Sequence, residues 1–128
     1  MVPCENVSPM SFRTGWSATA PRMARQAMRE WLADVPCSDA LVENALLVVS
    51  ELTTNALVHA GSAVTIVASF DYGRLRVEVH DEDPVPPQLR DQPDGNGGWG
   101  LRVVAGLADG WGWVPTSSGK QVWAEMLC

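Results

Sequence analysis

The segment VVSELTTNALVH, residues 48–59, carries the strongest helical pattern in this sequence, and the rest of the chain is interpreted around it. Its apolar residues recur at the spacing of one helix face, which predicts a helix packed against a core. Glu51 and Asn55 are four residues apart, so at about 100° per residue they stack on one face, at the border of the apolar stripe. A carboxylate and a carboxamide there can face a cleft beside the core, although an isolated pair of this kind is usually a solvated helix edge.

The composition is that of a folded globular protein with an acidic charge balance. Of the 128 residues, 46% are hydrophobic and 19% are charged, and nine basic against fifteen acidic residues give a net charge of −6. A chain of this length buries roughly two thirds of its unfolded surface, which is enough for one domain without disulfides. Nucleic-acid surfaces need clustered basic residues to neutralise phosphates, and the sequence has no basic run, so a nucleic-acid-binding function is disfavoured.

Cysteine usage and the first residues indicate a reducing, cytoplasmic setting. Cys4, Cys37 and Cys128 are odd in number and widely spaced, and they match neither a metal-binding pattern nor a disulfide framework. The beginning of the sequence lacks the design of a secretion signal, and no apolar run approaches the roughly 18 residues of a membrane span. We therefore expect no membrane association, a lead-in over residues 1–11 and a single domain over residues 12–128.

The period of the hydrophobic pattern predicts the remaining helices and strands. In chain order they are an edge strand over residues 10–14, helices over 20–33 and 38–60, a hairpin with strands over 64–70 and 74–81, a helix over 99–107, and a hairpin over 110–114 and 121–127. Ser38 is a favourable N-cap for the long helix, and Gly61 follows its end. The Pro-, Asp- and Gly-rich residues 82–98 form a long linker, which in a compact domain is usually a functional lid or disordered. This order predicts an α+β fold, a two-layer sandwich of a mixed, mostly antiparallel sheet with helices on one face.

Three polar or glycine-rich features stand at the ends of these elements. The first is the Glu51–Asn55 pair, and the second is Asp81 at the end of a predicted strand. The third is GNGGWGL, residues 95–101, which opens a predicted helix. Glycines before a helix N-terminus let backbone N–H groups approach an anion, and the helix dipole favours negative charge there. Taken singly, Asp81 is more often a turn former, and such a glycine cluster is also typical of any flexible loop.

Together, in this order and on these elements, the features resemble the Bergerat-fold (GHKL) ATP-binding superfamily. The matching motifs are ELTTNALVHA (residues 51–60), VEVHDEDP (77–84), GGWGLRVV (97–104) and GKQVWAEM (119–126). The resemblance covers roughly residues 12–127, and within the superfamily it is strongest to the anti-sigma-factor serine/threonine kinase family of actinobacterial type. It implies ATP and Mg²⁺ as cofactors.

The resemblance also implies a role for each matching residue. Glu51 would be the general base for the attacking hydroxyl, Asn55 the Mg²⁺ ligand and Asp81 the acceptor for the adenine amino group. The lid and helix start over the phosphates would be formed by Gly97, Gly98, Gly100 and Leu101. A single carboxamide suits Mg²⁺ only if ATP phosphates share the ion, because Mg²⁺ prefers charged oxygens and keeps several waters.

The sequence departs from the superfamily pattern at two places. After Asp81 the usual glycines are replaced by Glu82-Asp83-Pro84-Val85, which is expected to weaken ATP affinity more than it affects the fold. Gln121 stands where relatives often have a threonine near the nucleotide.

Three further polar residues have simpler interpretations than catalysis. Lys120 follows a turn glycine and is expected to be exposed to solvent, with a nucleotide phosphate as its alternative contact. His59 is expected to pack at the helix end beside the cleft, and His80 on the wet face of its strand.

Two functions of different classes are compatible with these features. The first is a kinase that binds Mg-ATP and phosphorylates a serine on an anti-sigma-factor antagonist, while binding a sigma factor in its other state. Glu51 beside Asn55 favours it, because nucleotide binding alone needs no base and phosphoryl transfer needs mainly positioning and charge neutralisation. The alternative is a non-catalytic regulator that acts through protein–protein contacts, which the missing glycines favour. A homodimer is compatible with either function.

Overall fold

The computed structural model describes residues 7–87 and 100–128 of the chain. Its helices and strands, in chain order, are β1 (Met10–Thr14), α1 (Ala20–Leu32), α2 (Asp39–Asn55), η1 (Ala56–Ala60), β2 (Val64–Asp71), β3 (Arg74–Asp81), α3 (Gly100–Leu107), β4 (Gly110–Pro115) and β5 (Lys120–Leu127). Each agrees with the element predicted from periodicity to within one or two residues, except at the end of the long helix. Most of the linker expected over residues 82–98 lies outside the described residues.

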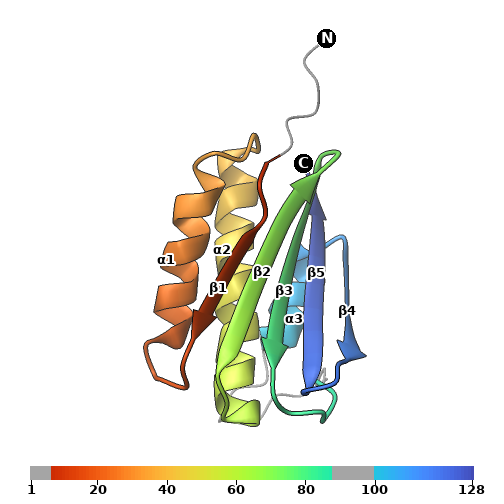
Figure 1. Cartoon of the computed structure of the whole chain (residues 1–128). Coiled ribbons are helices and arrows are strands. Elements are labelled where there is room, and N and C mark those ends of the chain that lie inside the picture. Colours follow the sequence, from red (N-terminus) through yellow and green to blue (C-terminus); the bar gives the residue numbers. More distant parts are fainter. Residues whose placement is uncertain (1–6, 88–99) are drawn as a thin grey trace.

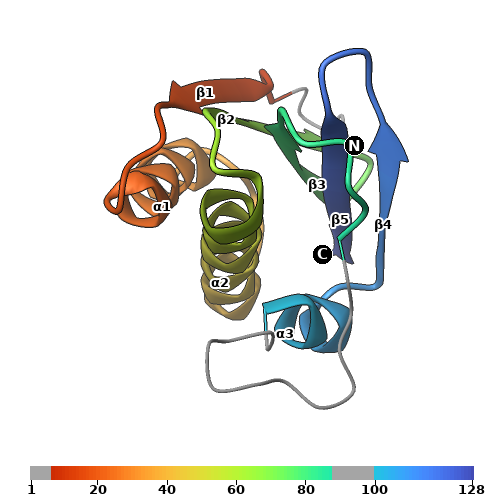
Figure 2. The ribbon, with the colours of Figure 1, turned by 90° about the horizontal axis from the view of Figure 1, so that it is seen from below.

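The five strands form one sheet in the order β1-β2-β3-β5-β4, with β1 at an edge as predicted. Every pairing among them is antiparallel. The three α-helices lie on one face of the sheet, with α2 at the centre (Figures 1 and 2). The predicted α+β, two-layer fold is therefore confirmed.

The core lies between the sheet and the helices, because each strand buries alternate residues. The inward rows of the three central strands are Val64, Ile66, Ala68 and Phe70 on β2, Leu75, Val77 and Val79 on β3, and Val122, Ala124 and Met126 on β5. The same alternation makes Asp81 the last inward residue of β3 and Lys120 the first inward residue of β5. These two residues are directly paired in the β3–β5 register. Two charged side chains therefore point inward at the same end of the sheet.

The long central helix changes geometry before it ends. Ser38 caps its start, with Oγ accepting a backbone N–H at 3.2 Å. The prediction of a regular helix to residue 60 was wrong over the last turn, because η1 is a π-helix in which Gly61 N donates to Ala56 O at 3.2 Å. The indole N–H of Trp16 donates to Leu57 O at 3.0 Å and so satisfies a carbonyl in this wider turn. Gly61 ends the helix at φ 61°, a left-handed conformation that glycine adopts without strain.

Helix α2 and η1 together, Asp39–Ala60, are long and apolar enough to cross a membrane by length and composition, with a mean hydropathy of 1.3 over their most apolar 18 residues. In this fold they form the central core helix, which contacts α1, α3, β3 and β5. Core helices of soluble proteins meet the same criterion, and 44% of this apolar stretch is buried inside the domain.

The outer face of the sheet carries a network of charged side chains. Arg76 Nε donates to Glu78 Oε2 at 2.8 Å, and the Arg76 guanidinium stacks 4.7 Å from the centre of the Trp123 ring. His80 lies on this face, as predicted, with Nε2 3.0 Å from Glu78 Oε1. Burial alone would raise the pKa of Glu78, but the hydrogen bonds and positive charges of Arg76 and His80 outweigh burial and lower this pKa. The network therefore contributes stability above the unfolded-state pKa of this carboxyl, and that contribution is lost as the pH falls through the folded-state value.

Two of the cysteines are brought together by the fold. Cys37, between α1 and α2, and Cys128, after β5, are free thiols close enough for each to affect the pKa of the other. Burial, together with the neighbouring Cys37, raises the pKa of Cys128 to about 11, and burial also raises the pKa of Cys37. Both thiols are therefore protonated at neutral pH. Cys4 lies outside the described residues.

Candidate functional site

A cavity of about 350 Å³ opens between the central helix and one end of the sheet. Its apolar lining consists of Leu52, Ala56, Val79, Val85, Pro86, Pro87, Leu101 and Val122. Its polar lining consists of Asn55, His59, Asp81, Asp83 and Lys120. A mostly apolar cavity of this size with a few converging polar groups is typical of a small-molecule site.

The start of α3 packs directly onto the predicted pair on α2. A methyl group added at Gly100 would lie 3.0 Å from Asn55 Oδ1 and 3.1 Å from Glu51 Oε2, so a residue with a side chain would press on both. Glycine at this position lets the first turn of α3 reach the carboxamide and the carboxylate. Two of the three predicted features, the Glu51–Asn55 pair and the glycine-rich helix start, are thus brought together at one edge of the cavity.

The predicted residues do not all occupy the same position relative to the cavity. Asn55 and Leu101 line it, and Leu101 is almost fully buried. Glu51, one helical turn earlier on α2, is half-buried and lies beside the lining rather than in it. Gly97 and Gly98 lie outside the described residues, so their predicted place above a ligand is untested.

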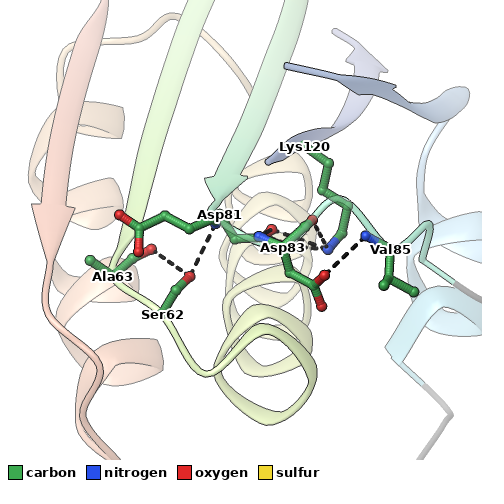
Figure 3. Close-up of polar contacts among 7 residues, drawn as sticks. Ser62, Ala63, Asp81, Asp83, Val85 and Lys120 are labelled. Atoms are coloured by element: carbon green, nitrogen blue, oxygen red, sulfur yellow. Dashed lines mark hydrogen bonds and ion pairs between the residues drawn. The ribbon is translucent and has the colours of Figure 1, made fainter. Parts of the chain in front are cut away.

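Asp81 forms a buried ion pair with Lys120 across the ends of β3 and β5 (Figure 3). Lys120 Nζ lies 3.1 Å from Asp81 Oδ1 and 3.0 Å from Asp81 Oδ2, and it also donates to the backbone oxygen of Asp83 at 3.0 Å. The two residues are only 4% and 5% exposed. The prediction that Lys120 is exposed to solvent was therefore wrong, because its position in the β5 alternation turns it inward.

The same alternation corrects the interpretation of Gln121. Gln121 pairs with His80 on the outer side of the sheet, and it does not line the cavity. The β5 residue beside the cavity at this level is Lys120.

Gly119 allows β5 to approach β3 closely enough for this ion pair. A methyl group added there would collide with the carbonyl oxygen of Asp81 and would lie 2.7 Å from Glu82 Cα. Only a residue without a side chain fits against this backbone, since a strand end cannot yield as a flexible side chain can. The close approach places Lys120 directly opposite Asp81.

The segment after Asp81 forms an ordered wall of the cavity although it contains no glycine (Figure 3). Glu82 N donates to Ser62 Oγ at 3.1 Å, and Asp83 N donates to Asp81 Oδ1 at 2.9 Å. Val85 N donates to Asp83 Oδ1 at 3.0 Å. Aspartate side chains that accept backbone N–H groups two residues later stabilise tight turns, and here they replace glycine in shaping the segment.

The described residues hold no group of three or more His, Cys, Asp or Glu side chains that could bind a metal ion. Asn55 offers one amide oxygen at the cavity wall, with Glu51 close to the same glycine. Mg²⁺ requires about six oxygen ligands and commonly takes several from water and substrate phosphates. The residues present therefore fit Mg²⁺ only as an ion that arrives with a polyphosphate.

Comparison with known proteins identifies the class to which this chain belongs. Residues 17–126 match the histidine kinase-like ATPase domain family. The match spans most of the chain, and the protein therefore belongs to this family, as the sequence motifs implied. No curated protein has a significantly similar sequence.

Solved structures with this fold include the following two. One contains the RsbU and RsbW domains of a protein from Mycobacterium tuberculosis, with 20% identity and a TM-score of 0.74 over 94% of this chain. This chain corresponds to only 32% of that longer chain. The other is the SiaB–SiaC complex from Pseudomonas aeruginosa, with 13% identity, a TM-score of 0.66, and coverage of 93% of this chain and 88% of the other. At these identities the likeness is one of fold.

Proposed function

We propose that this protein binds Mg-ATP in the cavity and transfers the γ-phosphoryl group to a serine or threonine of a partner protein. The observation that carries the proposal is the packing of Gly100 against both Glu51 and Asn55 at the cavity edge. This packing supports the proposal because a helix N-terminus, a carboxamide and a carboxylate that lie together would suit a phosphate and its metal ion. Membership of the histidine kinase-like ATPase domain family supports ATP as the ligand.

Each residue then has a distinct task in the reaction. Asn55 would hold Mg²⁺ together with phosphate oxygens and water, and the bound ion supplies neutralisation of phosphate charge. Glu51 accepts the proton of the attacking hydroxyl as its oxygen bonds to the γ-phosphorus. The bond from that phosphorus to the β–γ bridging oxygen breaks, and ADP leaves. The apolar cavity wall, including Val79 and Val122, suits the faces of a purine ring.

The proposed partner is an anti-sigma-factor antagonist as phosphoryl acceptor, with a sigma factor bound in another state of the protein. The motif resemblance supports this choice, and the two similar structures are named for RsbW and for a SiaB–SiaC complex. We also propose a homodimer and a cytoplasmic location. Analytical ultracentrifugation of the purified chain tests the dimer, and a monomer at all concentrations would refute it.

The kinase proposal is tested with radiolabelled ATP, Mg²⁺ and candidate antagonist proteins. Glu51→Gln should lower the initial rate of transfer by about 100-fold or more, the usual contribution of a general base. Glu43→Gln is the matched control, since Glu43 is exposed on the same helix two turns earlier and does not line the cavity. A Glu51→Gln protein that transfers phosphate as fast as the wild type would refute the catalytic role.

A second candidate function is that of a regulator that binds partners without catalysis. The observation that favours it is the Asp81–Lys120 ion pair, because it already occupies the carboxylate expected to recognise adenine. In that case Glu51→Gln would change neither nucleotide binding nor partner binding, and no transfer would be seen to any acceptor. Calorimetry with ATP separates the two functions, since affinity in the micromolar range would contradict a degenerate cavity.

A further inference from the structure

We infer that Lys120 is a specificity-determining residue, which makes the cavity nearly insensitive to the 6-amino group of the purine base. This inference rests on the proposed function, because it assumes that the base of a nucleoside triphosphate lies at the Asp81 end of the cavity. It identifies the ligand class as purine nucleoside triphosphates with little selection at position 6, rather than ATP alone.

Much of the acceptor capacity of Asp81 is used by the protein itself. Oδ1 accepts from Lys120 Nζ at 3.1 Å and from Asp83 N at 2.9 Å, which uses both of its lone pairs. The remaining acceptor sites are on Oδ2, which lies 3.0 Å from the Lys120 ammonium group. An amino group on the base can make at most one hydrogen bond there, to a carboxylate whose charge is already balanced.

Lys120 directs its ammonium group toward protein acceptors. It donates to Asp81 Oδ1 at 3.1 Å and to the backbone oxygen of Asp83 at 3.0 Å, and it lies 3.0 Å from Asp81 Oδ2 in the ion pair. An ammonium group has three N–H donors, so at most one is left for the oxygen at position 6 of guanine or hypoxanthine. The ion pair therefore favours neither an amino group nor an oxygen at position 6 strongly.

The ion pair also resists displacement by a ligand. Both side chains are about 95% buried, and Gly119 holds the two strand ends in contact. If Lys120 withdrew, a buried carboxylate and a buried ammonium would each lose their partner, which is strongly unfavourable. The base must consequently bind beside the intact pair.

The test compares binding of ATP and of purine riboside 5′-triphosphate, which lacks the 6-amino group, by calorimetry on the full chain with Mg²⁺. Wild-type protein should bind the two with affinities within about 5-fold, as expected for a hydrogen bond to a neutralised acceptor. Lys120→Thr keeps a hydroxyl beside Asp81 and frees the carboxylate charge. It should prefer ATP by about 10-fold or more, the range for a hydrogen bond to a charged group.

Arg29→Thr is the matched control, since it removes one positive charge from an exposed site on α1, a helix that does not line the cavity. It should leave the ratio of the two affinities at the wild-type value. A wild-type preference for ATP above about 5-fold, or an unchanged ratio in folded Lys120→Thr, would overturn the inference while leaving the proposed function intact. Failure of the wild type to bind any nucleoside triphosphate would overturn both. If Lys120→Thr does not fold, Lys120→Gln and the wild-type ratio decide the matter.

Discussion

Replacing either Asp81 or Lys120 by a neutral residue should destabilise the protein strongly, whereas replacing both should change its stability little. Lys120→Met leaves a buried carboxylate without its cation, and Asp81→Asn leaves a buried ammonium without its anion, at sites only 4–5% exposed. Breaking a buried pair in this way typically lowers the free energy of unfolding by about 3–5 kcal/mol. For 128 residues the unfolding entropy is roughly 0.27 kcal/mol/K, so the melting temperature should fall by about 11–18 °C.

The double variant Asp81→Asn, Lys120→Met contains no unpaired charge at this site. The amide oxygen introduced at position 81 can still accept the Asp83 backbone N–H that Oδ1 accepts now at 2.9 Å. We expect the double variant to be within about 1.5 kcal/mol of the wild type, since a buried pair and a packed neutral replacement are commonly close in stability.

Thermal and urea unfolding followed by circular dichroism measure all three variants. The exposed Arg13–Glu82 pair, at 3.9 Å with side chains 65% and 57% exposed, supplies the control. Arg13→Met should change the free energy of unfolding by less than about 1 kcal/mol. Single-variant losses below 1 kcal/mol at the buried pair, or losses that simply add in the double variant, would refute the reasoning.

Three further predictions concern glycine packing and thiol chemistry. Gly119→Ala should lower the free energy of unfolding by about 2–3 kcal/mol, because its methyl group would collide with the backbone of Asp81 and Glu82. Gly106→Ala, where the added methyl group meets no atom, should raise the free energy of unfolding by roughly 0.5–1 kcal/mol. Equal effects of the two variants in urea unfolding would contradict this prediction. Gly100→Ala should reduce phosphoryl transfer roughly 10-fold, with little change in melting temperature, because it displaces two flexible side-chain ends by a few tenths of an ångström; unaltered transfer would count against the proposed geometry. Because the pKa of Cys128 is raised from 9.0 to about 11, its alkylation at pH 8 should be roughly 10-fold slower than that of an ordinary thiol, since the thiolate is about 100-fold scarcer but more nucleophilic. The difference should vanish above pH 11, and a Cys4→Ser background with mass spectrometry identifies the site; a rate typical of a free thiol at pH 8 would show that the contact between Cys37 and Cys128 is not maintained.

The fold was predictable from sequence because its signals are local. Alternation in β2 and β3, the turn between them and the Ser38 cap depend on neighbours a few residues apart, which the sequence displays directly. The π-turn of η1 was not predictable, because its stability involves a hydrogen bond from Trp16, a residue distant in sequence. The contact between Cys37 and Cys128 was missed for the same reason.

The candidate site likewise contains residues that local sequence signals identify and contacts that they do not. Glu51, Asn55 and Gly100 could be selected from motif spacing, and the structure brings all three together. Lys120 could have been recognised as inward-facing, since it shares the parity of Val122, Ala124 and Met126 on β5. The turn glycine before it suggested an exposed residue, and that local signal was outweighed by strand alternation.

By itself the sequence determined the layers, the strand alternation and the choice of residues at the cavity, because periodicity and motif spacing are properties of the chain before it folds. Only the tertiary structure decided what those residues contact. From the sequence Asp81 is predicted to be a carboxylate at a strand end with no identified partner. The β3–β5 register places Lys120 opposite it, and the two residues form a buried ion pair. The surroundings of Glu51 and Asn55 were also decided by the tertiary structure, because Gly100 of α3, distant in sequence, packs against both side chains. Register and helix packing are long-range properties, so they settle which polar groups remain available to a ligand.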